Sequence, residues 1–378
     1  MPYRLLDEDR YYRQPVLDPK EYKRVIYDPG IVTRIIFNRP RYLNAFSHAL
    51  LAELEDAADR ASADPECHVV VLSGAGPCFS SGDDNNGLTP ESAPTLWDGD
   101  ARPPEKLVQQ YGSESAAWHQ YNIEHDHLIH WLPTNKLRTI PKPTIAMVHG
   151  WCIFQGLNVA SSMDMIFAAE DAMFLGARAD ARAIWNVGPR KALELAYEHR
   201  FLTAREAYDY HMVNRIFPTR EVLERETMSF AYRIARQSPS ALRRAKEEFL
   251  NTMDRFGFLA AVVDRTPHQM VWRQDAEEGH QMRYEGKGRA RTPVALANLK
   301  AKLDSEGKEI PAHVKKAIDR VAARDDKATW HKVLHAEWRD PKRVARADNS
   351  AGAYEQAKAE FEGKKKAEIE RRGLNIKV

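Results

Sequence analysis

Two short loops hold the residues whose placement could do chemistry, because each follows a strand-like apolar run. The first reads FSSGDD (79–84) and comes after HVVVLSG (68–74). The second reads WCIFQGLN (151–158) and comes after TIAMVHG (144–150). Turns that follow buried strands can aim backbone N–H groups at one point, and a pair of them can stabilise a developing oxyanion. The chemistry needs backbone amides, so the side chains at the donor positions are loosely constrained.

The second loop is unusual for such a role. Phe154 and Gln155 stand where an anion-binding turn would be expected to have a glycine pair. The backbone must therefore adopt the required shape in spite of two large side chains, and the loop raises the question of whether the turn still works.

The elements that position the two loops alternate between strand and helix patterns. In chain order we expect strands at 23–28, 31–38 and 68–74, with a helix capped by Ser47 before the third, a helix at 114–138, a strand at 144–150, a helix at 156–163, strands at 165–170, 172–176 and 212–218, a helix capped by Thr203, and two helices within 219–256 that break at Ser238-Pro239. This order predicts an α/β fold whose parallel strands are joined by helices.

The remaining segments differ in composition. Residues 1–22 are expected to form an irregular N-terminal arm, and residues 88–112 a surface insertion. Residues 285–378 are rich in Lys, Ala and Glu and are expected to form a helical appendage rather than a second core.

Composition narrows the class of protein. The chain has 378 residues, a formal net charge of +2 and three cysteines. Few, unpatterned cysteines disfavour a disulfide framework or a zinc site and favour a reducing compartment. No apolar run approaches the roughly 20 residues that span a bilayer. The N-terminus has no apolar h-region and contains acidic residues that disfavour a transit peptide. We therefore expect a soluble cytoplasmic protein.

Four segments resemble the enoyl-CoA hydratase/isomerase (crotonase) superfamily over roughly residues 23–260. These are IIFNRPRYLNAF, VVVLSGAGPCFSSGDD, IPKPTIAMVHG and TAREAYDYHMVNRIFP, which match the superfamily's motifs in order and spacing. The resemblance implies an α/β, crotonase-like spiral of ββα units with a C-terminal helical region. It also implies an acyl-CoA thioester as substrate, whose coenzyme A moiety is the only cofactor expected, and a homotrimer or hexamer.

The resemblance also assigns domains and site residues. It implies an arm at 1–22, a crotonase-like core at 23–260, and a helical trimerisation region with a basic extension at 261–378. The backbone N–H groups of Asp83 and Gln155 would be the oxyanion donors. The residues expected near the coenzyme A adenine and beside the first donor are Arg41, Leu43, Ala45, Ser81 and Gly82.

The chain departs from the superfamily at the two glutamates that deliver water in a hydratase. Asn158 stands at the first position, and an amide is no base near neutral pH. Arg178 stands at the second, in a loop that is about ten residues shorter than usual. Asp180 is the nearest carboxylate in that loop. These departures predict that a standard enoyl-CoA hydration mechanism does not apply.

Other side chains are candidates to replace the two glutamates. Asp84 is expected to stabilise its turn rather than act in catalysis. His127, in the segment EHDHLIHWLP, is a candidate for the acyl pocket, whereas a metal site there is disfavoured because adjacent helix residues point to different faces. His149 is interpreted as structural, and Trp151 and Trp185 as core residues or as pocket walls.

The function expected is enolate chemistry on a bulky or cyclic acyl-CoA, since a shorter loop would leave the acyl end more open. Hydration or C–C hydrolysis of such an acyl group is the reaction expected first, and isomerisation also fits. The alternatives are a catalytically silent acyl-CoA-binding homologue and a β-diketone hydrolase with a non-CoA substrate. The basic region at 285–378 holds 23 Lys/Arg against 15 Asp/Glu but lacks the aromatic platform typical of nucleic-acid binding, so nucleic acid is disfavoured as a partner.

Overall fold

The computed structural model describes residues 18–83, 132–133, 135–176, 181–263 and 291–319, together with Gln109 and Gly112. The chain divides into two compact units. The larger comprises Met1–Tyr197 and Phe201–Asp264, and the smaller comprises Glu198–Arg200 and Arg265–Val378. Almost all of the expected insertion at 88–112, and most of the expected helix at 114–138, lie outside the described residues.

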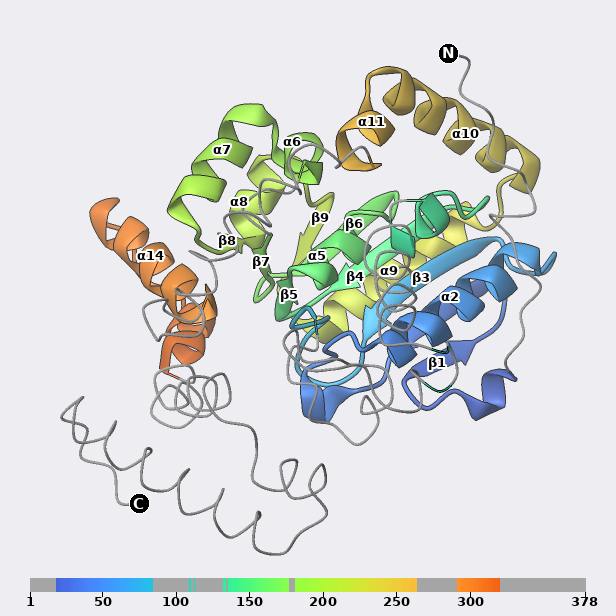
Figure 1. Cartoon of the computed structure of the whole chain (residues 1–378), viewed down its shortest axis with the longest axis horizontal. Helices are drawn as coiled ribbons and strands as arrows, with labels where there is room; N and C mark the ends of the chain where they lie inside the picture. Colours follow the sequence, from blue (N-terminus) through green and yellow to red (C-terminus); the bar gives the residue numbers. More distant parts are fainter. Residues whose placement is uncertain are drawn as a thin grey trace, which may run out of the picture. The chain divides into compact units, whose positions relative to one another are not determined.

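The larger unit is built on a six-stranded sheet in the order β1-β2-β3-β4-β6-β9 (Figure 1). Its strands are β1 (Val25–Asp28), β2 (Val32–Phe37), β3 (Val69–Gly74), β4 (Thr144–Val148), β6 (Met165–Ala169) and β9 (Arg215–Phe217). β1 and β2 are antiparallel, and each of the other neighbouring pairs is parallel. The predicted hairpin and the predicted parallel α/β arrangement are confirmed.

Helices cover both faces of this sheet, which explains why its central strands β3 and β4 are buried along their whole length. α2 (His48–Ala63) packs on one face and α9 (Arg220–Ile234) on the other (Figure 1). Along β3 the side chains alternate, so that Val70 and Leu72 join the α2 core while Val69 and Val71 join the α9 core. A strand buried on both faces reads as a continuous apolar run, as the sequence did at 68–74.

α2 shows how local signals place an element against the sheet. The Ser47 hydroxyl accepts a hydrogen bond from the N–H of Leu50 at 3.3 Å and so caps the helix as predicted. Leu50, Leu51 and Leu54 are fully buried at helical spacing. The carboxylate of Glu53 accepts from the backbone N–H of Val25 at 3.0 Å, which ties the helix to β1.

A second, three-stranded sheet in the order β5-β7-β8 corrects one prediction. It contains β5 (Trp151–Ile153), β7 (Met173–Leu175) and β8 (Leu202–Thr203). A helix at 156–163 was expected directly after the strand at 144–150, but the chain first forms β5, and the helix α5 is Gln155–Ala160. β5 is three residues long and pairs with β7, a partner distant in sequence, so local periodicity did not indicate it.

The larger unit contains further helices, of which only the one capped by Thr203 and the two within 219–256 were predicted. They are the 3-10 turns η1 (Pro19–Glu21) and η2 (Pro40–Tyr42) and the helices α6 (Arg182–Val187), α7 (Pro189–Glu198), α8 (Ala204–Asp209), α10 (Pro239–Arg255) and α11 (Phe258–Val263). Thr203 caps α8 in a capping box with Glu206, and α9 and α10 are separated at Ser238-Pro239, both as predicted. The strand expected at 212–218 is shorter, because Met212 and Val213 belong to the turn after α8 and both donate to Ala207.

The smaller unit contains α14 (Arg291–Ser305) and a helical segment at 312–319. Its buried apolar residues include Ala295, Leu296, Leu299 and Val314. The predicted helical character of 285–378 is confirmed for these two stretches. Within the part of the chain that is described, we find no helix whose length and apolarity would let it cross a bilayer.

Candidate active site

The two loops singled out from the sequence lie side by side in the larger unit. The N–H of Ser80 donates to the carbonyl of Trp151 at 2.9 Å, and the N–H of Ile153 donates to the carbonyl of Ser80 at 3.1 Å. These bonds form a parallel bridge between Ser80 and Cys152. The first loop is therefore fixed against β5, the strand that leads into the second turn.

Two glycines allow the loops to approach this closely. Gly82 has φ = 93°, and a Cβ placed there would lie 2.8 Å from the carbonyl oxygen of Ile153. A Cβ at Gly156 would lie 2.9 Å from the Cβ of Ser80. Both positions exclude a side chain for steric reasons, and at Gly82 the positive φ adds a second reason.

Hydrogen bonds to two carbonyl groups set the directions of the two predicted oxyanion donors. The carbonyl of Gly82 accepts from the N–H of Phe46 at 2.8 Å. In a planar trans peptide the N–H points opposite to the carbonyl, so the N–H of Asp83 is directed away from Phe46. By the same rule, the carbonyl of Phe154 accepts from the N–H of Asn158 at 2.9 Å, so the N–H of Gln155 points back out of the first turn of α5.

Phe154 supplies the answer to the question raised by the bulky second loop. Its backbone has φ = 46° and ψ = −110°, a conformation normally reserved for glycine. Its N–H donates to the carbonyl of Leu175 at 2.7 Å, which anchors the turn to β7. The turn therefore keeps the backbone conformation of a glycine turn while it carries a phenylalanine side chain. The Cβ of Phe154 lies 3.3 Å from the place that a Cβ on Gly82 would occupy.

The loop expected near the coenzyme A adenine is joined directly to the first turn. The N–H of Ser81 donates to the carbonyl of Leu43 at 2.9 Å. Ala45 is buried, whereas Arg41, in η2, is exposed. The structure thus brings Leu43 and Ala45 together with Ser81 and Gly82, and leaves the side chain of Arg41 open to solvent.

Asn44 is a structural centre of this region that the sequence reasoning missed. It has φ = 52° and is fully buried. Its side-chain amide donates to the carbonyls of Ala75 and Cys78, both at 2.8 Å, and accepts from the N–H of Arg39 at 2.9 Å. The available signal was the asparagine of the LNA motif, because asparagine tolerates a left-handed backbone better than most residues.

Asn158 makes a side-chain contact within α5. Its Nδ2 donates to Oε1 of Gln155 at 3.0 Å. Gln155 is 1% exposed and Asn158 is half-buried. The position predicted for the first glutamate of a hydratase thus holds an amide that is bonded to a second amide, and this pair supplies no general base near neutral pH.

Three predicted catalytic residues lie outside the described residues. Arg178 and Asp180 fall within 177–180, and His127 falls within 113–131. Asp84 is also outside. Their roles stay predictions. Among the described residues, no group of three or more His, Cys, Asp or Glu side chains is arranged to hold a metal ion.

Two cysteines and a histidine beside the turns are buried, and their surroundings suit a structural role. Burial raises the pKa of the Cys78 thiol to about 12 and raises that of Cys152 well above its ordinary value. Neither thiol is therefore a ready nucleophile. His149 is 3% exposed, its Nε2 lies 2.9 Å from the carbonyl oxygen of Gly76, and burial lowers its pKa. This environment agrees with the structural role predicted for His149.

The two tryptophans weighed as pocket walls pack on other aromatic rings. The Trp151 ring centroid lies 6.5 Å from that of Phe201, and the Trp185 centroid lies 5.5 Å from that of Phe258 on α11. Both rings are half-buried. The packing of Trp185 joins α6 to α11, so its contact is structural whether or not it also borders a ligand.

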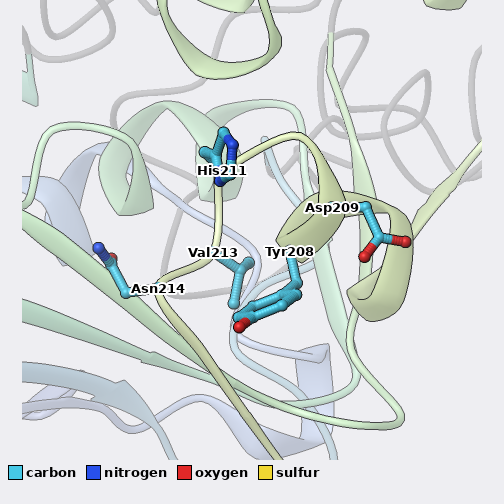
Figure 2. A pocket seen from close by; sticks show the side chains of 5 residues that line it. All are labelled: Tyr208, Asp209, His211, Val213 and Asn214. Carbon is cyan, nitrogen blue, oxygen red and sulfur yellow. The ribbon is translucent and has the colours of Figure 1, made fainter.

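A surface depression of about 390 Å³ lies between α8 and β9 and is lined by Tyr208, Asp209, His211, Val213 and Asn214 (Figure 2). Asn214 comes directly before β9, whereas the first turn follows β3 and the second follows β5, a strand of the smaller sheet. None of the residues that line this depression belongs to either turn. Figure 2 also shows the side chains of Asp209 and Asn214 pointing away from each other.

Comparison with known proteins agrees with the geometry. The family model described as enoyl-CoA hydratase/isomerase matches residues 29–102 and 118–290, more than half of the chain. The chain therefore belongs to the enoyl-CoA hydratase/isomerase family, and the predicted membership of the crotonase superfamily is confirmed.

The individual relatives match this chain at modest sequence identity. A putative enoyl-CoA hydratase, EchA13 of Mycobacterium tuberculosis, is 32% identical over 256 residues, which are 65% of this chain and 79% of that protein. The human mitochondrial Delta(3,5)-Delta(2,4)-dienoyl-CoA isomerase is 28% identical over 237 residues, 59% of this chain and 66% of the isomerase. The crystal structure of an enoyl-CoA hydratase/isomerase from Xanthobacter autotrophicus Py2 has a TM-score of 0.52 at 28% identity and covers 64% of this chain and 84% of that one. The crotonase-like fold is thereby confirmed.

Proposed function

We propose that this chain is an enzyme that acts on an acyl-CoA thioester by stabilising an enolate with the backbone N–H groups of Asp83 and Gln155. The observation that carries the proposal is the fixed orientation of these two peptides. Each has its carbonyl bonded to a partner, Gly82 to Phe46 and Phe154 to Asn158, and the loops that hold them are bridged at Ser80 and Cys152. Donors fixed before the reaction stabilise developing charge without reorganisation.

In the proposed reaction, a base removes a proton from the α-carbon or γ-carbon of the thioester. The electron pair delocalises onto the thioester oxygen, which receives hydrogen bonds from the two amides. Reprotonation at a different carbon moves the double bond and gives isomerisation. Hydration would instead require a group that delivers water to the β-carbon.

The described residues favour proton transfer over hydration by a glutamate pair. Asn158 occupies the first glutamate position and its amide is bonded to Gln155. One relative is described as a dienoyl-CoA isomerase, a reaction that needs no water. We therefore place isomerisation of an unsaturated acyl-CoA first. Hydration or C–C hydrolysis of a bulky or cyclic acyl group follows as the second candidate, for which the shortened loop remains the argument.

Two assays test this function. Purified protein is incubated in deuterium oxide with a saturated acyl-CoA, and with crotonyl-CoA, a 3-enoyl-CoA and a 3,5-dienoyl-CoA. We expect deuterium at the α-carbon and migration of the double bond, with slow hydration of crotonyl-CoA. Fast hydration of crotonyl-CoA would contradict the argument from Asn158.

The same assays separate the alternatives. Binding of the thioester without incorporation of deuterium would indicate a silent acyl-CoA-binding homologue. Turnover of a free β-diketone without retention on CoA-agarose would indicate a non-CoA hydrolase. The homotrimer or hexamer and the cytoplasmic location are part of the proposal, and sedimentation of the full chain tests the former.

A further inference from the structure

Ser80 occupies the point at which the two turns and the loop at residues 39–45 meet. Its side chain is fully buried. Its backbone forms the bridge to β5 already described, through Trp151 and Ile153. On the other side, its Cβ and Oγ lie 2.9 Å and 3.2 Å from the position of a Cβ on Gly156, so the first turn of α5 packs directly on this serine.

The hydroxyl of Ser80 uses both of its hydrogen-bonding functions. Oγ donates to the carbonyl of Asn44 at 2.8 Å and accepts from the N–H of Gly82 at 3.1 Å. One O–H group can donate once and still accept, and alanine can do neither. The hydroxyl therefore connects the loop at 39–45 to the amide that immediately precedes the peptide of Asp83.

Gly82 is consequently held at both of its backbone groups. Its N–H is bonded to Ser80 Oγ, and its carbonyl is bonded to the N–H of Phe46. Because the φ of Gly82 is 93° and glycine is conformationally permissive, the residue would adopt other conformations readily if one of these bonds were lost. A rotation at Gly82 would turn the N–H of Asp83 away from its present direction.

We propose that Ser80 is a positioning residue, whose hydroxyl aims the Asp83 amide and whose backbone sets the distance of that amide from the Gln155 amide. The inference rests on the proposed function, since it assigns these two amides as the oxyanion donors. It adds a side-chain requirement to a site whose donors are backbone groups. Ser80 does not itself touch the reacting atoms in this scheme.

The test compares Ser80→Ala with Ser62→Ala. Ser62 lies in α2, and its hydroxyl donates to the carbonyl of Ala58 at 2.7 Å, so the control also loses one hydroxyl-to-carbonyl bond but belongs to neither turn. For Ser80→Ala we expect a fall of about tenfold to a hundredfold in the rate of α-carbon deuterium exchange and in kcat, with KM changed less than about threefold. We expect Ser62→Ala to keep the wild-type rate.

A spectroscopic measurement separates positioning from general loosening. A conjugated dienoyl-CoA bound in the wild-type protein should show a red-shifted absorption band, because the two amides polarise its carbonyl. The shift should shrink in Ser80→Ala at saturating ligand and persist in Ser62→Ala. Ser80→Cys, which replaces the oxygen with a larger sulfur that is both a weak donor and a weak acceptor, should give an intermediate rate and shift if the alanine variant does not fold.

The outcomes are distinguishable. Wild-type exchange rates and an undiminished red shift in Ser80→Ala, or in Ser80→Cys if the alanine variant is unfolded, would overturn the positioning role and leave the proposed function intact. Failure of the wild-type protein to bind or exchange any of the thioesters would overturn the proposed function, and the inference would fall with it.

Discussion

The backbone of Phe154 leads to a prediction about stability in which the usual ranking of two residues is reversed. Phe154 has φ = 46° and ψ = −110°, so any residue with a Cβ is strained there. Two substitutions isolate this strain. Phe154→Ala removes the ring and keeps the Cβ, and Phe154→Gly removes both.

The magnitude follows from two opposing terms. A non-glycine residue in a sparsely populated region costs of order 1–3 kcal/mol, which glycine recovers. Glycine also loses more backbone entropy on folding, which costs about 0.5–1 kcal/mol relative to alanine. We therefore expect Phe154→Gly to be more stable than Phe154→Ala by roughly 0.5–2 kcal/mol.

A matched pair at an ordinary position provides the control. Ala52 is exposed on α2, where Ala52→Gly should lower the free energy of unfolding by about 0.5–1 kcal/mol. Urea unfolding of the four proteins, followed by tryptophan fluorescence, gives the midpoints and slopes. If glycine at 154 were less stable than alanine by as much as glycine at 52, the positive φ at Phe154 would be refuted, and with it the account of the second turn.

Three further predictions concern buried polar groups. Thr227 is fully buried, and its hydroxyl finds no hydrogen-bond partner among the described residues, so Thr227→Val should stabilise the protein by about 1 kcal/mol in thermal melts. The control is Thr144→Val, which removes the acceptor of a 2.9 Å hydrogen bond from the N–H of Asp164 and should destabilise the protein. Burial raises the pKa of the Asp59 carboxyl to about 6 against the opposing effect of Lys136, whose Nζ lies 2.6 Å from Asp59 Oδ2. Between about pH 4 and pH 6 the folded state therefore holds a proton that the unfolded chain has released, so the free energy of unfolding falls as the pH rises through this range. Asp59→Asn should reduce this pH dependence by up to about 1.4 kcal/mol per pH unit. The contribution of Asp59 is disproved if stability has the same pH dependence in both proteins. All three cysteines of the chain are buried, so iodoacetamide at pH 8 should label none in the native protein and all three in urea, as read by mass spectrometry; native labelling would contradict their burial.

The parts of the fold that could be predicted depend on residues close in sequence. Ser47 and Thr203 act within three residues of their own positions, and the break at Ser238-Pro239 is a property of proline itself. The buried run at 68–74 needs only its composition. The folded structure keeps these local conformations because the packing of the helices on both faces of the sheet favours the same conformations.

The parts that could not be predicted depend on distant partners. β5 exists because Trp151–Ile153 pairs with Met173–Leu175, and no three-residue run indicates such a pairing. Asn44 is held by carbonyls of Ala75 and Cys78, more than thirty residues away. The predicted donors Asp83 and Gln155 came from resemblance, while the strain at Phe154 became visible only in the backbone angles.

The connection between β3 and β4 has a consequence for how the chain can vary in length. The chain leaves the sheet at Gly74 and returns at Thr144, yet the register of the two strands is set by their own pairing, Val70 with Thr144. Near the start of the connection, hydrogen bonds at Ser80 and Gly82 hold the backbone in one position. Doubling the length of a loop costs only about 0.6 kcal/mol. A change in the length of this connection therefore costs little free energy, and the bonds at Ser80 and Gly82 hold the Asp83 peptide in place whatever that length is.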